Sequence, residues 1–198
     1  MVSRASNIEL ELATRLEKMV RLNDDLMEAL HAVRSLNLTN WSIAAGAVRS
    51  AVWDQLHGYT VATPLDDIDV VYFNAEVLPE NDQQLEQQLR AIHPKLNWEV
   101  TNQANVHHWF FAEFGQKVEQ LSSLVHGIST WPEYATCVGI TMAKDDSIEV
   151  IAPHGLNDLF TMLVRHNPSR SDVETFLRRI NAKKFQRRWP LIKIVDPI

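Results

Sequence analysis

The first 35 residues carry apolar side chains at steps of mostly three and four positions. This spacing places the apolar side chains on one face of a helix and the charged ones on the opposite face. The pattern predicts one long amphipathic helix or two helices broken near Asn23. The apolar positions are Ile8, Leu10, Leu12, Leu16, Met19, Val20, Leu22, Leu26, Leu30 and Val33.

Short β-branched and aromatic runs follow, separated by residues typical of turns. The predicted strands are residues 41–45, 67–73, 97–101, 136–142 and 147–151, with a hairpin turn at Lys144-Asp145-Asp146. The predicted helices are residues 47–56, 81–91, 106–111, 120–127, 155–164 and 171–184. Ser171 and Glu174 are spaced as a capping box at the start of the last helix.

The length and composition suit one domain, because 198 residues with 45% hydrophobic content can bury a full core. Cys137 is the only cysteine, which excludes an intramolecular disulfide and favours a reducing compartment. Its apolar neighbours predict a buried, unreactive thiol. No apolar run reaches the roughly 18 residues of a membrane span, and the N-terminus lacks a signal-peptide pattern. We therefore expect a cytoplasmic protein with no membrane partner.

The net charge of −6 is unevenly distributed. Residues 165–198 hold nine Lys or Arg and three Asp or Glu, whereas residues 1–164 hold ten and twenty-two. This basic end either binds a polyanion or neutralises the acidic body. Neutralisation is favoured, because aromatic residues are not interleaved with the basic ones. We expect Phe176, Leu177, Ile180 and Phe185 to dock the last helix, and a solvated basic face made of Arg178, Arg179, Lys183, Lys184, Arg187 and Arg188.

Two aspartates, Asp67 and Asp69, lead into the apolar run at residues 70–73. Side chains at positions i and i+2 of a strand point to the same face, so the two carboxylates project together, with Cα atoms roughly 6.6 Å apart. Like charges at this spacing repel, and a hard cation such as Mg²⁺ relieves the repulsion. The pair indicates a metal site, and the alternative is two solvated acids at the mouth of a strand.

A third carboxylate, Glu99, lies on the next predicted strand, on the side opposite Trp98 and Val100. Gly46 opens a predicted helix, whose N-terminal amides and dipole favour a phosphate, and Arg49 lies one turn further along. Phosphoryl transfer from a nucleoside triphosphate (NTP) uses divalent ions held by clustered carboxylates. These residues therefore point to a phosphoryl-transfer site with Mg²⁺, or Mn²⁺, as the cofactor.

Several blocks together resemble a bacterial nucleotidyltransferase-like family of the polymerase-β-type nucleotidyltransferase superfamily. The superfamily order is Ala45-Gly46-Ala47, then Asp67-Ile68-Asp69 on a strand, then Glu99 on a later strand. The family blocks, which span about residues 41–167, are Gly46-Ala47-Val48-Arg49 with Val52-Trp53-Asp54, residues 67–73, residues 98–107, Ala135-Thr136-Cys137-Val138-Gly139 and residues 153–160.

The resemblance implies an α/β (α+β) fold of the polymerase-β type, a mixed sheet flanked by helices with an N-terminal helical extension. It implies that Asp67, Asp69 and Glu99 are the catalytic, metal-binding carboxylates, and that Gly46, with Ala47 and Arg49, forms the nucleotide-binding turn. Ala47 departs from the usual Ser or Gly and lacks a hydroxyl for a phosphate. We expect one domain over residues 1–198, with a helical extension (1–38), a catalytic core (41–167) and a C-terminal basic helix and tail (168–198).

Asn102, Gln103 and His107 follow Glu99 closely, within a block that the resemblance marks as characteristic. They either contact substrate or hold Glu99 in place. His107 and His108 lack the Cys partners and the spacing of a zinc site, so we expect no zinc there.

The sequence thus predicts a Mg²⁺-dependent nucleotidyltransferase that moves a nucleoside monophosphate from an NTP to an acceptor and releases pyrophosphate. A small molecule, a protein or an RNA can be the acceptor on such a scaffold. One alternative is a catalytically silent nucleotide-binding or interaction module on the same fold. Another is a nucleic-acid-binding protein that uses the basic tail.

Overall fold

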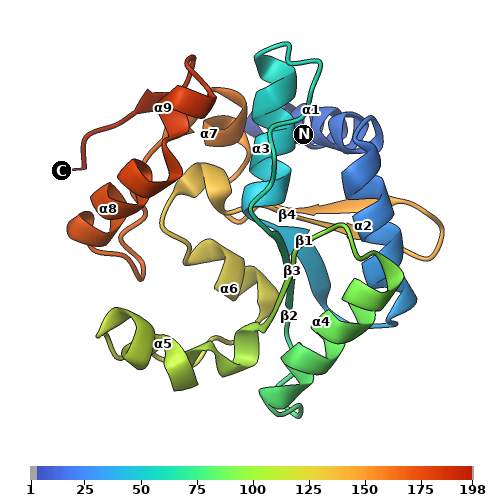
Figure 1. Ribbon diagram of the computed structural model, residues 1–198. Coiled ribbons are helices and arrows are strands. Elements are labelled where there is room, and N and C mark those ends of the chain that lie inside the picture. The colour runs from blue at the N-terminus through green and yellow to red at the C-terminus, as the bar shows by residue number, and fades with distance from the viewer. Residues whose placement is uncertain (1–3, 198) are drawn as a thin grey trace.

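The computed structural model describes residues 4–197, with side chains from residue 6 onward. Within this range a five-stranded sheet has the strand order β3-β2-β1-β4-β5 (Figure 1). Strand β1 is antiparallel to β2 and β4, β4 is antiparallel to β5, and β2 and β3 are parallel. The sheet is therefore mixed, as expected. The strands are β1 Trp41–Ala44, β2 Ile68–Tyr72, β3 Trp98–Asn102, β4 Gly139–Met142 and β5 Ile148–Ile151.

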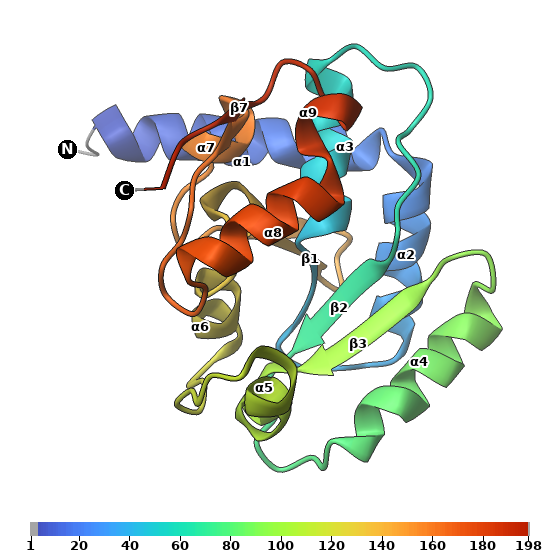
Figure 2. The same cartoon turned by 60° about the vertical axis from the view of Figure 1, so that its left-hand side comes forward.

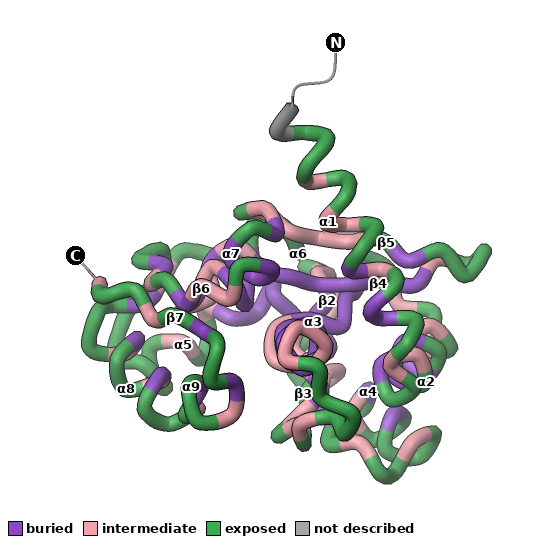
Figure 3. The backbone as a smooth tube through the Cα atoms, turned by 90° about the horizontal axis from the view of Figure 1, so that it is seen from above, coloured by how far each residue is buried: buried purple, intermediate pink, exposed green. Residues whose placement is uncertain are grey.

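Four helices bury their apolar sides against one face of this sheet, in a core that includes Leu16, Leu30 and Val52. Figure 3 shows the buried backbone concentrated in the sheet and in α3. The predicted break is confirmed at Asn23, whose side chain accepts a hydrogen bond from the Leu26 amide at 3.0 Å and begins the second helix. The helices are α1 Arg4–Arg21, α2 Asp24–Ser35, α3 Gly46–Leu56 and α4 Glu80–Ile92.

The opposite face of the sheet carries a smaller apolar cluster that includes Val71, Leu124 and Ile128. Helices α5, α6 and α8 lie on this side, away from α2 and α4 (Figures 1 and 2). The remaining elements are η1 Gln103–Asn105, α5 Val106–Phe114, α6 Leu124–Ser129, η2 Tyr134–Thr136, α7 Asn157–Phe160, β6 Leu163–Val164, α8 Val173–Lys183, α9 Phe185–Arg188 and β7 Lys193–Ile194. Strands β6 and β7 pair in parallel.

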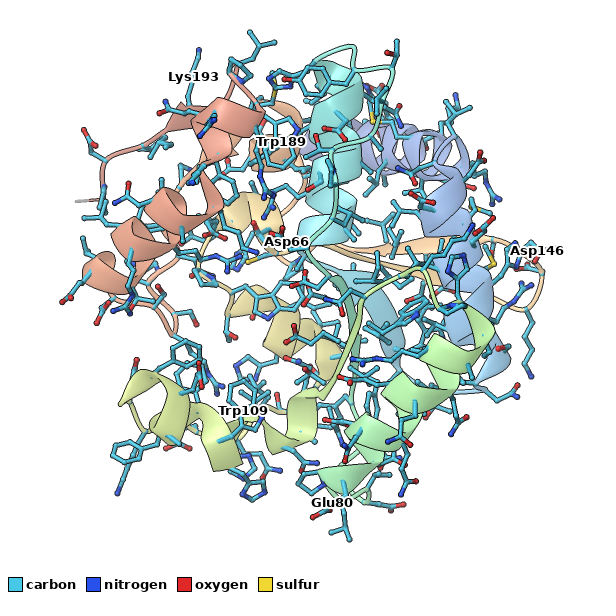
Figure 4. The ribbon with its side chains drawn as sticks, in the orientation of Figure 1. Asp66, Glu80, Trp109, Asp146, Trp189 and Lys193 are labelled. Atoms are coloured by element: carbon cyan, nitrogen blue, oxygen red, sulfur yellow. The ribbon has the colours of Figure 1, made fainter. Side chains whose placement is uncertain are left out.

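The C-terminal segment is anchored on α3 by Trp189. Its ring meets Trp53 edge to face with centroids 5.3 Å apart, and its indole Nε1 donates a 2.6 Å hydrogen bond to Asp54 Oδ1 (Figure 4). Asp54 also accepts hydrogen bonds from the amide and hydroxyl of Thr63, at 2.7 and 2.6 Å. One buried carboxylate thus binds both the loop before β2 and the C-terminal segment.

The prediction that apolar residues dock the last helix is confirmed for Phe176 and Ile180 of α8 and for Phe185 at the start of α9, since all three are buried. The prediction is wrong for Leu177, whose side chain is 45% exposed because it lies on the outer side of the helix. The capping residue is Asp172 rather than Ser171, because the Asp172 carboxylate accepts a 2.7 Å hydrogen bond from the Thr175 amide.

Three predicted boundaries are wrong. The helix expected from residue 120 begins at Leu124, because Ser123 is extended and caps it through the His126 amide at 3.0 Å. The helix expected over residues 155–164 is only α7, since Met162 has a φ of 56° and the next residues join β6. Strand β4 starts at Gly139, because Thr136 lies in the turn η2. Across residues 4–197 no helix is both long and apolar enough to cross a membrane.

Candidate active site

Strand β2 separates its side chains between the core and a cavity of about 1360 Å³. Ile68 and Val70 are buried in the core, whereas Asp69, and Asp67 just before the strand, line the cavity. This is the period-two alternation of a strand with one apolar face. The parallel register pairs Asp69 with Glu99 on β3, and Glu99 lines the same cavity. We call these three carboxylates the acidic wall.

The acidic wall is electrostatically strained. Burial, and then the charges of Asp67 and Glu99, raise the pKa of the Asp69 carboxyl to about 7. The pKa of Glu99 is also raised, first because neighbouring atoms exclude water from part of its carboxyl and then because Asp67 is near. Arg179 and the Gly46 amide act in the opposite direction on Asp69 without cancelling the effect. A cation at this wall would remove the repulsion.

The donor set of the acidic wall suits Mg²⁺ or Mn²⁺, because both ions prefer carboxylate oxygens. In the arrangement described for residues 4–197, no three His, Cys, Asp or Glu side chains lie close enough together to hold a metal ion. Coordination by all three carboxylates therefore requires their side chains to rotate toward a common point.

The turn from β1 into α3 lies beside the acidic wall. Ala45 has φ 54° and ψ −119°, a conformation that L-residues rarely adopt. The Gly46 amide is close enough to the Asp69 carboxylate to lower its pKa, although burial outweighs this effect. A Cβ added at Gly46 would lie 3.8 Å from Arg49 Nη2 and 4.0 Å from Asp69 Oδ2, which are ordinary contacts. Gly46 thus leaves an open space between the carboxylate and the guanidinium. Ala47 is buried in the core, away from that space.

Arg49 is a buried cation at the inner end of the cavity. Its guanidinium lies 4.7 Å from the centre of the Phe185 ring, and Nη1 donates a 3.1 Å hydrogen bond to the Thr136 hydroxyl. Burial lowers the pKa of this guanidinium to about 10. Among the described residues its Nε atom has no hydrogen-bond partner. The Nε atom is enclosed by protein, whereas Nη2 borders the open space at Gly46.

The cavity has a second wall of opposite charge, formed by Arg178, Arg179 and Lys183 of α8. We call this the basic wall. Arg179 Nε donates a 2.6 Å hydrogen bond to the buried Glu133 carboxylate, and Lys183 lies 3.2 Å from Asp66. The expectation of a solvated, body-neutralising face is confirmed for Arg178, which is exposed. Arg179 and Lys183 are only partly exposed, and each pairs with an acid of the body, as neutralisation predicts. Their place in the cavity wall was not expected.

Helix α5 supplies a third wall that is aromatic. Val106, Trp109, Phe110 and Phe114 line the cavity, at positions i, i+3, i+4 and i+8 of one helix face. Neither this wall nor the basic wall was predicted as part of the site. The uneven charge of the C-terminal 34 residues was the available signal for the basic wall.

The three residues expected near Glu99 are placed differently from one another. Asn102 is buried and its Oδ1 accepts hydrogen bonds from the amides of Asn74 and Ala104, each at 3.1 Å, so it fixes the turn after β3. Gln103 is buried beside Gly127 and lines the cavity. His107 stacks on His108 with ring centroids 3.9 Å apart, and it is outside the cavity lining. Of the three, only Gln103 is placed to meet a ligand.

Known proteins resemble this chain in sequence and in fold. A family model described as nucleotidyltransferase matches residues 31–194, which is most of the chain. The chain belongs to this nucleotidyltransferase family. One solved structure is described as revealing a CCA-adding enzyme head domain, and its sequence is 26% identical to that of this chain. The two structures superpose with a TM-score of 0.78, and the match covers 92% of this chain and 95% of the other.

Two larger enzymes share the fold at lower identity. The Thermotoga maritima CCA-adding enzyme complexed with tRNA is 14% identical, with a TM-score of 0.54, and a CCA-adding enzyme with CTP is 13% identical, also with 0.54. Each match covers 92% of this nucleotidyltransferase, which spans only 42% and 43% of those chains. No curated protein matches the sequence.

Proposed function

We propose that this nucleotidyltransferase transfers a nucleoside monophosphate from an NTP to an acceptor and releases pyrophosphate, with Mg²⁺ or Mn²⁺ at the acidic wall. One observation carries the proposal. An acidic wall with a raised carboxyl pKa faces a basic wall across one cavity, beside the open space at Gly46. Carboxylates whose mutual repulsion is not cancelled by neighbouring cations suit divalent ions, and the opposing arginines suit the triphosphate that accompanies those ions.

Asp67, Asp69 and Glu99 are the residues that would hold the ions, with Glu99 on the acceptor side. When bound, a divalent cation would neutralise the phosphate charges and lower the pKa of an acceptor hydroxyl. Arg49 and Arg179 face the cavity and would neutralise the triphosphate and the pyrophosphate that departs.

The proposed reaction is a single displacement. The acceptor oxygen forms a bond to the α-phosphorus, the bond from that phosphorus to the bridging oxygen of the β-phosphate breaks, and pyrophosphate leaves. In this proposal Glu99 accepts the proton of the acceptor hydroxyl. Its raised pKa suits a proton acceptor better than that of an ordinary glutamate.

Structural neighbours include CCA-adding enzymes solved with CTP and with ATP, which is consistent with an NTP substrate. At 13% and 14% identity they support the fold and not the acceptor. A small molecule, a protein and an RNA therefore remain the acceptor classes of this proposal.

The test is incubation with each α-labelled NTP, Mg²⁺ or Mn²⁺ and a cell extract, followed by detection of labelled product. We expect product with the wild-type chain and none with Asp69→Asn. Nucleotide binding without product under any of these conditions would instead identify a catalytically silent nucleotide-binding module.

A further inference from the structure

The cavity face of α5 keeps large aromatic side chains accessible. Trp109 is 43% exposed and Phe114 is 50% exposed, and Phe110 packs beside Phe114 with ring centroids 4.6 Å apart. Figure 4 shows Trp109 on this helix. Exposed aromatic rings gathered on one face of a cavity mark a surface that a ligand covers.

Positive charge borders these rings. The Arg170 guanidinium lies 5.8 Å from the centre of the Phe110 ring, and its buried Nη1 has no hydrogen-bond partner among residues 4–197. Arg178 of the basic wall lines the same cavity. Flat rings next to arginines match a nucleotide unit, whose base stacks and whose phosphate accepts hydrogen bonds.

The aromatic face lies on the acceptor side of the proposed chemistry. Glu99, Thr101, Gln103 and Val106 line the cavity in chain order from β3 into α5. The Gly46 turn and Arg49 instead reach the cavity from β1 and α3. The region at the Gly46 turn and Arg49, where the triphosphate is proposed to bind, is therefore distinct from the region that extends from Glu99 to the aromatic rings of α5.

We propose that the cavity face of α5 binds the 3′-terminal nucleotide of a nucleic-acid strand and presents its terminal hydroxyl as the acceptor. The proposal rests on the proposed function, because it names the acceptor of the same site. The base stacks on Trp109 and Phe114, and the phosphate meets Arg170. The cavity volume of about 1360 Å³ exceeds the roughly 300–1,000 Å³ of a small-molecule pocket, so a strand end fits beside the NTP.

The preference for a neutralising basic end rested on the lack of aromatic residues between the basic ones. In the fold, α5 brings Trp109 and Phe114 to the cavity that Arg178 lines, although more than 60 residues separate them in sequence. The combination of basic and aromatic side chains that binds single strands is thus assembled from two helices.

The experiment measures fluorescence anisotropy of a 5′-labelled ten-nucleotide RNA with a free 3′ hydroxyl, in parallel with the matching DNA and with a labelled mononucleotide. Trp109→Ala should weaken RNA binding by about tenfold, as loss of one stacked base does. Trp109→Phe retains a ring and should restore most of the binding. Arg170→Gln should flatten the salt dependence by about 0.7 in slope.

Phe111 provides the matched control, because it is 54% exposed on the same helix but is outside the cavity lining. Phe111→Ala should leave RNA binding unchanged. Equal losses for Phe111→Ala and Trp109→Ala would overturn the proposal, and so would binding of the mononucleotide as tightly as of the strand. Equal binding of RNA and DNA would support a strand acceptor read without its 2′ hydroxyl.

A separate measurement distinguishes failure of the acceptor site from failure of the proposed function. Thermal stabilisation by Mg²⁺ with a non-hydrolysable NTP tests the acidic wall and Arg49, and Trp109→Ala should leave it intact. Thermal stabilisation without RNA binding would overturn the α5 proposal and leave the proposed function standing. Labelling of a protein in the assay with α-labelled NTPs would also overturn the α5 proposal alone, because the acceptor would then be a protein. Absence of stabilisation in the wild-type chain would overturn the proposed function.

Discussion

A Cβ built on Gly46 would lie 4.0 Å from Oδ2 of Asp69, so the first residue of α3 and an acid of β2 face each other across an open space. Nη2 of Arg49 borders the same space, 3.8 Å from that Cβ position. The Gly46 amide also lowers the pKa of the Asp69 carboxyl, against the larger effect of burial. Gly46 therefore contributes an open space between an acid and a guanidinium.

Gly46→Ala should separate folding from ligand binding. A Cβ there makes only ordinary contacts, and alanine favours a helix over glycine by up to about 1 kcal/mol, so the free energy of unfolding should stay the same or rise. The methyl group would occupy the open space, and NTP affinity should fall by about tenfold, equivalent to about 1.4 kcal/mol. Chemical denaturation and titration calorimetry measure the two effects. An unchanged affinity would place the triphosphate elsewhere.

The double substitution Asp67→Asn with Asp69→Asn should abolish the stabilisation that Mg²⁺ and an NTP give together. Ligand binding at a hundred times Kd raises the free energy of unfolding by about 2.7 kcal/mol. Without ligands the variant should be as stable as the wild-type chain or more so, because two repelling charges are gone. Thermal melts with and without ligands provide the comparison, and a persisting shift would contradict the metal assignment.

The pH dependence of stability carries a signature of Asp69. Because its pKa is raised to about 7 in the folded chain, the folded state holds a proton between about pH 4 and pH 7 that the unfolded state has lost. The contribution of Asp69 to stability is therefore favourable below pH 4 and decreases as pH rises through 7, by at most about 1.4 kcal/mol per pH unit. In Asp69→Asn this decrease should disappear, which denaturation at pH 5 and pH 8 would measure.

Glu99→Gln should lower turnover much more than it lowers NTP affinity. Glu99 lies on β3, on the acceptor side, whereas the Gly46 turn and Arg49 lie on the triphosphate side. Steady-state kinetics beside direct NTP binding would show the split. Equal losses would move Glu99 to the triphosphate side, and wild-type activity would make it an ordinary surface acid.

Ala45→Gly should raise the free energy of unfolding by about 1 kcal/mol. The φ of 54° at Ala45 strains an L-residue, and glycine relieves that strain at a smaller entropic cost. For a chain of this size the melting temperature should rise by about 2–4 °C per kcal/mol. A lower melting temperature would show that the alanine methyl group makes packing contacts that outweigh the strain.

The strand positions and the acidic wall were predictable because their signals are local. Alternation along β2 and β3 assigns Asp69 and Glu99 to one face, and Ile68 and Val100 to the other. The break at Asn23 was equally local, because its cap involves the Leu26 amide three residues later. Short-range periodicity therefore specified most elements and the chemical type of the site.

The other two walls depend on contacts that no local pattern encodes. Arg179 meets Glu133 from 46 residues away, and burial of Phe176 together with the Trp189 contact on α3 positions α8 at the cavity. The early end of α7 depends on pairing between Leu163 and Lys193. The sequence showed that basic and aromatic residues exist, and tertiary packing determines that they face the acids.

Asp54 binds Thr63, which lies shortly before β2, and Trp189, which lies just after α9. One side chain of α3 thus ties the loop that leads into Asp67 and Asp69 to the segment that follows α8 and α9. The position of these two walls relative to each other therefore depends in part on a contact outside the cavity lining. Variation at Asp54 would accordingly change which substrates fit before it changed how fast a fitting substrate reacts.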